Sequence, residues 1–145
     1  MPPLPRHPRR GVTLPELSIA LVVVGLLAAF ALRAGAPLVD AARARSAGDE
    51  VRSAFALARA LAALRAERAA VRLDTLRGAV TVHLRGDSAL RRSLVTLYGV
   101  RMSATRDSMA YAASGLGWGA SNLRIELRRG AAVETVTVSR LGRVR

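Results

Sequence analysis

The chain has 145 residues, enough for one domain of ordinary size with an appended segment. It contains no Cys, which excludes disulfides, thiolate metal sites and a cysteine nucleophile, and its two His, His7 and His83, lie too far apart in sequence to suggest a zinc site. All 23 basic residues are Arg, and the net charge of +13 favours anionic partners such as nucleic acid or lipid headgroups.

The first element in the chain is a basic leader followed by a long apolar run. Residues 1–10, MPPLPRHPRR, contain four Pro and three Arg and are not expected to form a helix. Residues 12–32 would span about 30 Å as a helix, which is one hydrocarbon thickness. Because the arginines precede this run, the positive-inside rule keeps the N-terminus in the cytoplasm and places the rest of the chain outside.

Three ordinary interpretations of this run remain open at this point: a plain signal anchor, a cleaved secretory signal and a twin-arginine signal. The small residues at 34–36 suit cleavage by a signal peptidase, but Pro37 follows them directly and its imide makes a poor scissile bond. Arg9 and Arg10 favour the twin-arginine alternative. None of the three explains Glu16, because a carboxylate at the bilayer centre costs about 2.5 kcal/mol or more. An acidic residue in a membrane helix predicts a functional site.

The amphipathic segment at 34–68 continues the helix. Val51, Phe55, Ala58 and Ala62 recur at spacings of three and four residues and predict one buried face. We therefore expect a single helix of about 50 residues, with a kink at Pro37.

Alternating apolar and polar residues predict strands in the remainder of the chain, at 71–73, 79–85, 94–102, 123–128 and 133–140. A short loop is expected at 85–92, and the last two strands form an antiparallel hairpin. Such a sheet needs a cover on one face, which the amphipathic helix provides. The predicted fold is α+β, with a long N-terminal helix packed on a C-terminal antiparallel sheet, in the shape of a ladle.

Residues that suggest chemistry are few. His83 has no neighbouring ligand in sequence and is interpreted as structural, and the glycines at 115–119 predict a turn with a packed Trp118. We find no nucleophile with a base, so the chain is not expected to be an enzyme, and no cofactor or metal is expected.

The segment Gly11-Val12-Thr13-Leu14-Pro15-Glu16-Leu17 and the apolar run after it resemble the class III signal of type IV pilins and type II secretion pseudopilins. The resemblance implies that prepilin peptidase cuts between Gly11 and Val12 and that Val12 is then N-methylated. It also implies that Glu16 pairs with the free N-terminal amine of a neighbouring subunit during assembly. The chain departs from the family pattern at Val12, where Phe or Met is usual, and at Pro15.

Within this group the whole chain resembles the GspH/FimT subfamily, through residues 55–73, Ser114-Gly115, LRIEL at 123–127 and VTVSRLGRVR at the end. The resemblance implies a minor pseudopilin of a type II secretion system, a structural subunit of a short periplasmic filament. It would be a single-pass protein of the bacterial inner membrane, with its C-terminal domain in the periplasm. The implied partners are other pseudopilins or pilins, the inner-membrane assembly platform and membrane lipid.

The expected organisation is a leader at 1–11, a membrane and assembly helix at 12–33, its amphipathic continuation at 34–68 and a β-rich domain at 69–145. A FimT-like minor type IV pilin is the alternative. In that subfamily a C-terminal Gly-Arg-x-Arg segment is associated with DNA binding during natural transformation. The match falls on Gly142, Arg143 and Arg145, and Arg140, Arg128 or Arg129 would extend the patch.

Overall fold

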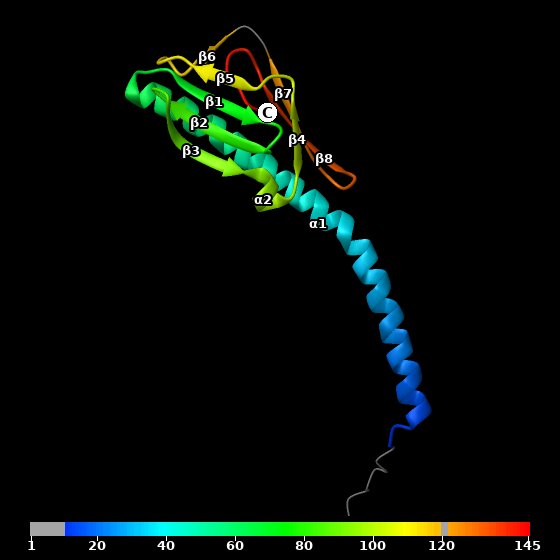
Figure 1. The fold of residues 1–145 in the computed structure, drawn as a ribbon. Helices are drawn as coiled ribbons and strands as arrows, with labels where there is room; N and C mark the ends of the chain where they lie inside the picture. Colours follow the sequence, from blue (N-terminus) through cyan, green and yellow to red (C-terminus); the bar gives the residue numbers. More distant parts are fainter. Residues whose placement is uncertain (1–10, 120–121) are drawn as a thin grey trace, which may run out of the picture. The chain divides into compact units, whose positions relative to one another are not determined.

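The computed structural model describes residues 11–119 and 122–145 (Figure 1). Its chain divides into two compact units, of which the first ends at Ala36 and the second begins at Pro37. A single helix, α1 (Leu14–Arg65), contributes to both units and is 52 residues long. This confirms the predicted helix of about 50 residues. Pro37 lies inside the helix, and the kink predicted there stays a prediction.

The first unit is an apolar helix whose described side chains are exposed. From Leu14 to Ala31 every residue is exposed, because none of the residues that the structure describes packs against this stretch. The helix is long and apolar enough to cross a membrane, and none of its most apolar window is buried within the protein. A fully apolar helix surface requires either lipid or other apolar helices around it.

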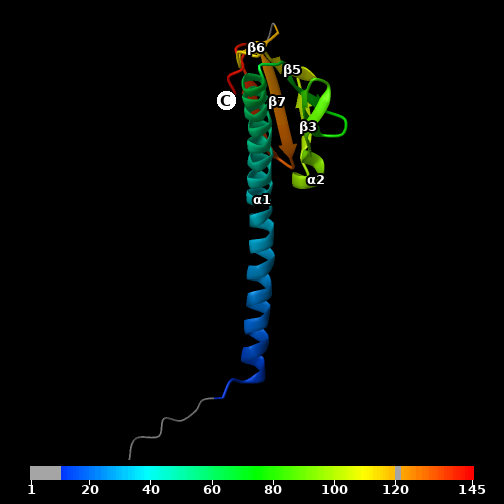
Figure 2. The same ribbon diagram turned by 90° about the vertical axis from the view of Figure 1, so that its left-hand side faces the viewer.

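The second unit combines the remainder of α1 with two antiparallel sheets (Figures 1 and 2). The larger sheet has the strand order β3-β2-β1-β5-β6 and the smaller one the order β4-β7-β8. The strands are β1 (Ala69–Asp74), β2 (Ala79–Leu84), β3 (Asp87–Ser93), β4 (Arg101–Ala104), β5 (Ser108–Tyr111), β6 (Gly117–Trp118), β7 (Leu123–Arg129) and β8 (Ala132–Val138). A one-and-a-half-turn helix, α2 (Leu94–Tyr98), connects β3 to β4.

The core lies between α1 and the inner faces of the two sheets. The predicted stripe of Val51, Phe55, Ala58 and Ala62 is fully buried, which confirms the helical period. Several of the buried helix positions are Ala, so the sheets approach the helix closely and Val, Ile and Leu from the strands fill the space. The α+β prediction is confirmed: one long helix packs on antiparallel sheets.

The structure contradicts the prediction for residues 85–102. A strand was predicted at 94–102, but residues 94–98 form α2, since the Ser93 hydroxyl accepts the Thr96 N–H and Gly99 ends the helix at a left-handed φ of 64°. The predicted short loop contains β3 instead, an edge strand that is exposed or half-exposed throughout and so carries no apolar alternation. β5 was also not predicted.

Three ion pairs fasten the sheets to α1 within the second unit, and one of them joins Arg92 of β3 to Glu50 (3.1 Å). Arg129 donates from Nε to Asp40 (2.8 Å) and from Nη1 to the carbonyls of Tyr98 (2.8 Å) and Gly99 (3.1 Å). Arg52 donates from Nη2 to Glu134 at 2.6 Å, and this hydrogen bond raises the pKa of Arg52. Because Arg129 bonds to α1 and to the end of α2 at once, it fixes α2 beside the start of the second unit.

Candidate assembly motif and C-terminal arginine site

The predicted cleavage junction lies in non-helical chain just before α1. Gly11, Val12 and Thr13 are exposed and belong to no helix or strand, so their backbone is accessible. The rest of the predicted leader, residues 1–10, lies outside the described residues. A protease can reach a peptide bond whose backbone is exposed and outside a helix.

Glu16 caps the helix from within its first turn. Its Oε2 accepts the backbone N–H of Thr13 at 3.5 Å, while the Thr13 carbonyl accepts the N–H of Leu17 at 3.1 Å. Thr13 is thus the residue before the helix and Glu16 the third within it, the spacing of a capping box. The negative charge also lies at the positive end of the helix dipole. Our sequence interpretation missed this local role, although the Thr-x-x-Glu spacing is its usual signal.

Glu16 is also chemically isolated in the first unit. Among the described residues 11–36 it is the one acidic side chain, and Arg33 is the one basic side chain, 17 positions further on. About five helical turns therefore separate the two charges. A partner for the Glu16 carboxylate within the apolar run must come from the chain's own start or from another molecule.

At the other end of the chain, the C-terminal tail folds back on β8. The backbone of Thr137 exchanges two hydrogen bonds with Arg145 (2.9 and 2.8 Å), and Ser139 N–H bonds to the Arg143 carbonyl (2.8 Å). A bond from Gly117 N–H to the Leu141 carbonyl (3.2 Å) joins the same tail to β6 in the other sheet. The tail thus bridges the edges of both sheets.

Gly142 makes this return possible. Its φ of +83° is in the left-handed region, and a Cβ at this position would overlap the ring edge of Tyr111. The buried Tyr111 hydroxyl donates to the Gly142 carbonyl at 3.1 Å. The Gly of the Gly-Arg-x-Arg segment therefore has a structural role, and the arginines are what it positions.

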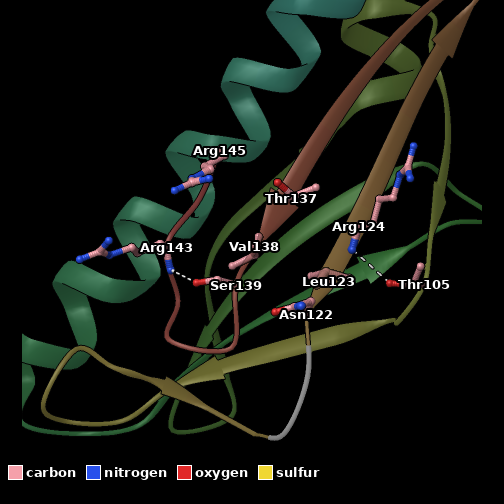
Figure 3. Close-up of a pocket in the computed structure, with 9 residues that line it drawn as sticks. All are labelled: Thr105, Asn122, Leu123, Arg124, Thr137, Val138, Ser139, Arg143 and Arg145. Carbon is pink, nitrogen blue, oxygen red and sulfur yellow. Dashed lines mark hydrogen bonds between the residues drawn. The ribbon is translucent and has the colours of Figure 1, made fainter.

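Arg143 and Arg145 are exposed side chains that line one pocket of about 620 Å³ (Figure 3). Arg124 of β7 lines the same pocket, because Thr137 pairs with Arg124 on one side and with Arg145 on the other. Leu123 and Val138 form the apolar part of the lining, and four polar side chains that can donate to an anion form the rest. They are Thr105, Asn122, Thr137 and Ser139. Sequence reasoning missed Arg124, since only the strand register brings it to the tail.

The other arginines named from the sequence divide into two groups. Arg140 is exposed at the turn, where its N–H donates to Asn122 at 3.0 Å, and it does not line the pocket. Arg128 lies on the exposed face of β7 directly opposite Arg101 of β4. Arg129 is bound to Asp40 and to two carbonyls, so it does not extend an anion-binding surface.

Two further interpretations concern His83 and Trp118. His83 is half-exposed in β2, and its Nδ1 lies 3.4 Å from the Gly86 carbonyl. Within the described residues no group of three His, Asp or Glu side chains is arranged to hold a metal. The prediction of a packed Trp118 is wrong, because this side chain in β6 is 60% exposed and its partner is Arg68, whose guanidinium lies 5.9 Å from the ring centre. β6 is the edge strand of the larger sheet.

Comparison with known proteins places these features in context. The prokaryotic N-terminal methylation motif matches residues 6–32. Two crystal structures of the type IV minor pilin FimU from Pseudomonas aeruginosa superpose with TM-scores of 0.59 and 0.57, at 11% identity. These superpositions cover 70% of this chain and 86% and 90% of the FimU chains. None of the curated proteins compared with this sequence matches it.

At this identity the likeness to FimU shows the fold alone, whereas the motif concerns the N-terminus. The two findings are independent, since the motif covers residues 6–32 and the second unit holds the sheets. The chain thus combines the prokaryotic N-terminal methylation motif at residues 6–32 with a fold similar to that of a type IV minor pilin.

Proposed function

We propose that this protein is a minor subunit of a membrane-anchored periplasmic filament. Prepilin peptidase removes residues 1–11, Val12 becomes the methylated N-terminus, and α1 holds the chain in the inner membrane, with the second unit in the periplasm. The observation that carries the proposal is the methylation motif at residues 6–32, which includes the exposed apolar start of α1 and Glu16 in its first turn. Nothing in this arrangement requires the protein to be an enzyme.

Within that role we assign the chain to a type II secretion system, as a minor pseudopilin that joins other pseudopilins on the assembly platform. The assignment rests on the sequence resemblance at residues 55–73 and at the C-terminus. The likeness to FimU does not distinguish a subunit of a type II secretion system from a subunit of a type IV pilus, because a likeness at 11% identity concerns the fold alone.

The charge of the second unit supports a minor subunit over the main one. Residues 37–145 contain 19 Arg against nine Asp or Glu, a net charge of +10. Seven of those nine carboxylates already form ion pairs within the unit, so they are not available to neutralise a second copy. A filament of identical copies would repel itself, whereas a single copy among less basic subunits would not.

The maturation step is tested by the intact mass of the protein extracted from membranes. We expect the loss of residues 1–11 and one added methyl group on Val12. A Gly11→Leu variant should keep its leader and its methyl-free N-terminus. A mature chain that starts near Ala36, or an uncut chain, would contradict the proposal.

The role of Glu16 in assembly is tested by two substitutions. Glu16→Gln keeps a carbonyl oxygen that can cap Thr13 N–H but removes the charge, and Glu16→Ala removes both. If the carboxylate pairs with the N-terminal amine of a neighbour, both variants should be cleaved and inserted normally and both should be lost from sheared filaments. Normal incorporation of the Gln variant, with loss of the Ala variant, would show that capping is the function of Glu16.

DNA binding in natural transformation is the second candidate function, and the C-terminal pocket favours it. Arg143, Arg145 and Arg124 surround a pocket with four polar side chains, an arrangement that suits phosphate oxygens. Arg140, at the neighbouring turn, would extend the contact along the duplex. In this role the protein would be a FimT-like minor type IV pilin.

This candidate is tested with the full chain in detergent and a short DNA duplex. Arg143→Ala plus Arg145→Ala should weaken binding strongly and flatten its salt dependence by about two phosphate contacts. Arg72→Ala plus Arg91→Ala removes the same charge from the outer face of the larger sheet and serves as the control. Equal losses in the two double variants would indicate nonspecific attraction and contradict a C-terminal DNA site.

A further inference from the structure

One end of the second unit carries exposed apolar side chains beside two exposed arginines, Arg101 and Arg128. It is the end at which the unit begins, because Arg129 fixes the last residues of α2 to Asp40 of α1 (Figures 1 and 2). The turn between β1 and β2 lies against the same short helix: Leu94 N–H donates to the Gly78 carbonyl at 2.8 Å. We call this surface the α2 end; it comprises α2, residues 75–78, Arg101 and Arg128.

Three large apolar side chains project from the α2 end into solvent. Leu76 in the turn is 98% exposed, and Leu97 and Val95 of α2 are 55% and 46% exposed. The turn and α2 touch, since a Cβ on Gly78 would overlap the Val95 side chain. Adjacent exposed apolar side chains on one end of a small domain favour contact with another apolar phase.

The same end carries charge that the fold leaves uncompensated. Arg101 and Arg128 are directly opposite each other on β4 and β7, and like charges in this position destabilise a sheet. Within the part of the chain that the structure describes, neither side chain forms an ion pair. An anion bound between them would remove the repulsion.

Chain length limits how far the α2 end can be from the membrane. If the apolar run ends at the hydrocarbon boundary near Arg33, Asp40 lies at most about 10 Å beyond it, whatever the angle between the units, because seven helical residues rise by that amount. The headgroup layer adds about 5–8 Å to each side of the hydrocarbon. The α2 end is therefore within side-chain reach of the lipid headgroups.

We propose that the α2 end docks on the anionic phospholipid headgroups of the membrane that holds α1. Leu76, Leu97 and Val95 would enter the interface, and Arg101 and Arg128 would bind phosphates. A second copy of the chain is a poor occupant, because it would present the same positive charge. The inference rests on the proposed insertion of α1 and adds to it a resting position for the domain before assembly.

The test uses the mature full-length chain in lipid nanodiscs and single labelled cysteines, which the natural sequence lacks. A fluorescent label at Leu97→Cys probes the α2 end, with quenching by lipids that are spin-labelled on the headgroup. Leu116→Cys is the matched control, because Leu116 is similarly exposed (50%). Its turn contains Gly115, which lies near Ala63 of α1, and Ala63 is about 35 Å further along the helix than Asp40. Leu27→Cys, quenched by lipids that are spin-labelled on the acyl chain, tests insertion itself.

We expect the label at position 97 to be quenched in nanodiscs of phosphatidylcholine with phosphatidylglycerol, and the label at 116 not to be. Arg101→Gln plus Arg128→Gln should lower the docked fraction relative to the free one by about fivefold per arginine removed. Nanodiscs of phosphatidylcholine alone, or a high salt concentration, should also lower the docked fraction. Unchanged Trp118 emission in the double variant verifies that the fold is intact.

The outcomes separate the two proposals. Headgroup docking would be overturned, and insertion kept, if the label at 27 is quenched normally while the labels at 97 and 116 are quenched equally. The same conclusion would follow if quenching at 97 depends neither on anionic lipid nor on the two arginines. No quenching at 27 would overturn insertion, and the docking with it.

Discussion

Replacing Gly142 by Ala tests whether the C-terminal arginines depend on the tail's return to β8. The residue combines a φ of +83° with direct contact to the buried ring of Tyr111, so a methyl group at this position is opposed by the backbone and by the packing. It also lies beside Gly117, whose N–H is 3.2 Å from the position of the new Cβ. No rotation of an alanine side chain relieves these contacts.

The expected cost follows from two contributions. A left-handed backbone costs a non-glycine residue about 1–2 kcal/mol, and an additional methyl in a packed site typically costs about 1–3 kcal/mol. Tyr111 is fully buried and cannot move aside. We therefore expect Gly142→Ala either to lower the free energy of unfolding by about 2–5 kcal/mol or to release the tail from β8 at a similar cost.

Urea unfolding of the full chain in detergent measures the first result, with Trp118, the one Trp of the sequence, as the probe. Hydrogen exchange measures the second, because the amide of Arg145 bonds to Thr137 only while the tail is docked. Gly119→Ala is the control: Gly119 also has a positive φ of 119°, but a Cβ there would meet no atom of residues 11–119 or 122–145 within 4 Å. Wild-type stability and full protection of the Arg145 amide in Gly142→Ala would refute the reasoning.

Two further predictions concern Tyr111 and Arg129. Burial raises the pKa of the Tyr111 phenol, while the positive charge of Arg59 acts in the opposite direction. The stability that the neutral, buried phenol contributes is therefore present below about pH 10 and is lost as the pH rises through the raised pKa. Tyr111→Phe should remove this alkaline loss and cost about 1 kcal/mol at neutral pH for the missing hydrogen bond to Gly142, which unfolding curves from pH 8 to 11 measure. Arg129→Met should cost about 2–4 kcal/mol, since it leaves the Asp40 carboxylate and two carbonyls without their donor. The neighbouring exposed Arg128→Met should change the urea midpoint little, and equal effects of the two substitutions would contradict this role for Arg129.

The sequence was sufficient where one local period decides the structure. The helical spacing of Val51, Phe55, Ala58 and Ala62 identified the buried face of α1, and alternation identified most of β2, β7 and β8 and half of β1. These patterns are reliable because each residue is buried or exposed according to its own position in the element.

The errors fall where local and tertiary preferences compete. LVTLY at 94–98 is rich in strand-forming residues, yet the caps at Ser93 and Gly99 close it into a helix. β3 lacks an apolar face because it forms the edge of its sheet, so its pattern predicts a loop. Trp118 seemed a core residue by type, but its strand is also an edge.

The sequence by itself determined the apolar helix, the place of Glu16 and the methylation motif, because each of these is a property of consecutive residues. The tertiary structure alone decided which arginines lie together. Arg124 and Arg145 are 21 positions apart, but the register of β7, β8 and the tail places them on either side of Thr137, where both line one pocket. Arg128 and Arg129 are adjacent in sequence, but Arg128 is on an exposed face and Arg129 is bound to Asp40. Charge is encoded residue by residue, but its arrangement in space depends on strand pairing, which brings distant residues together.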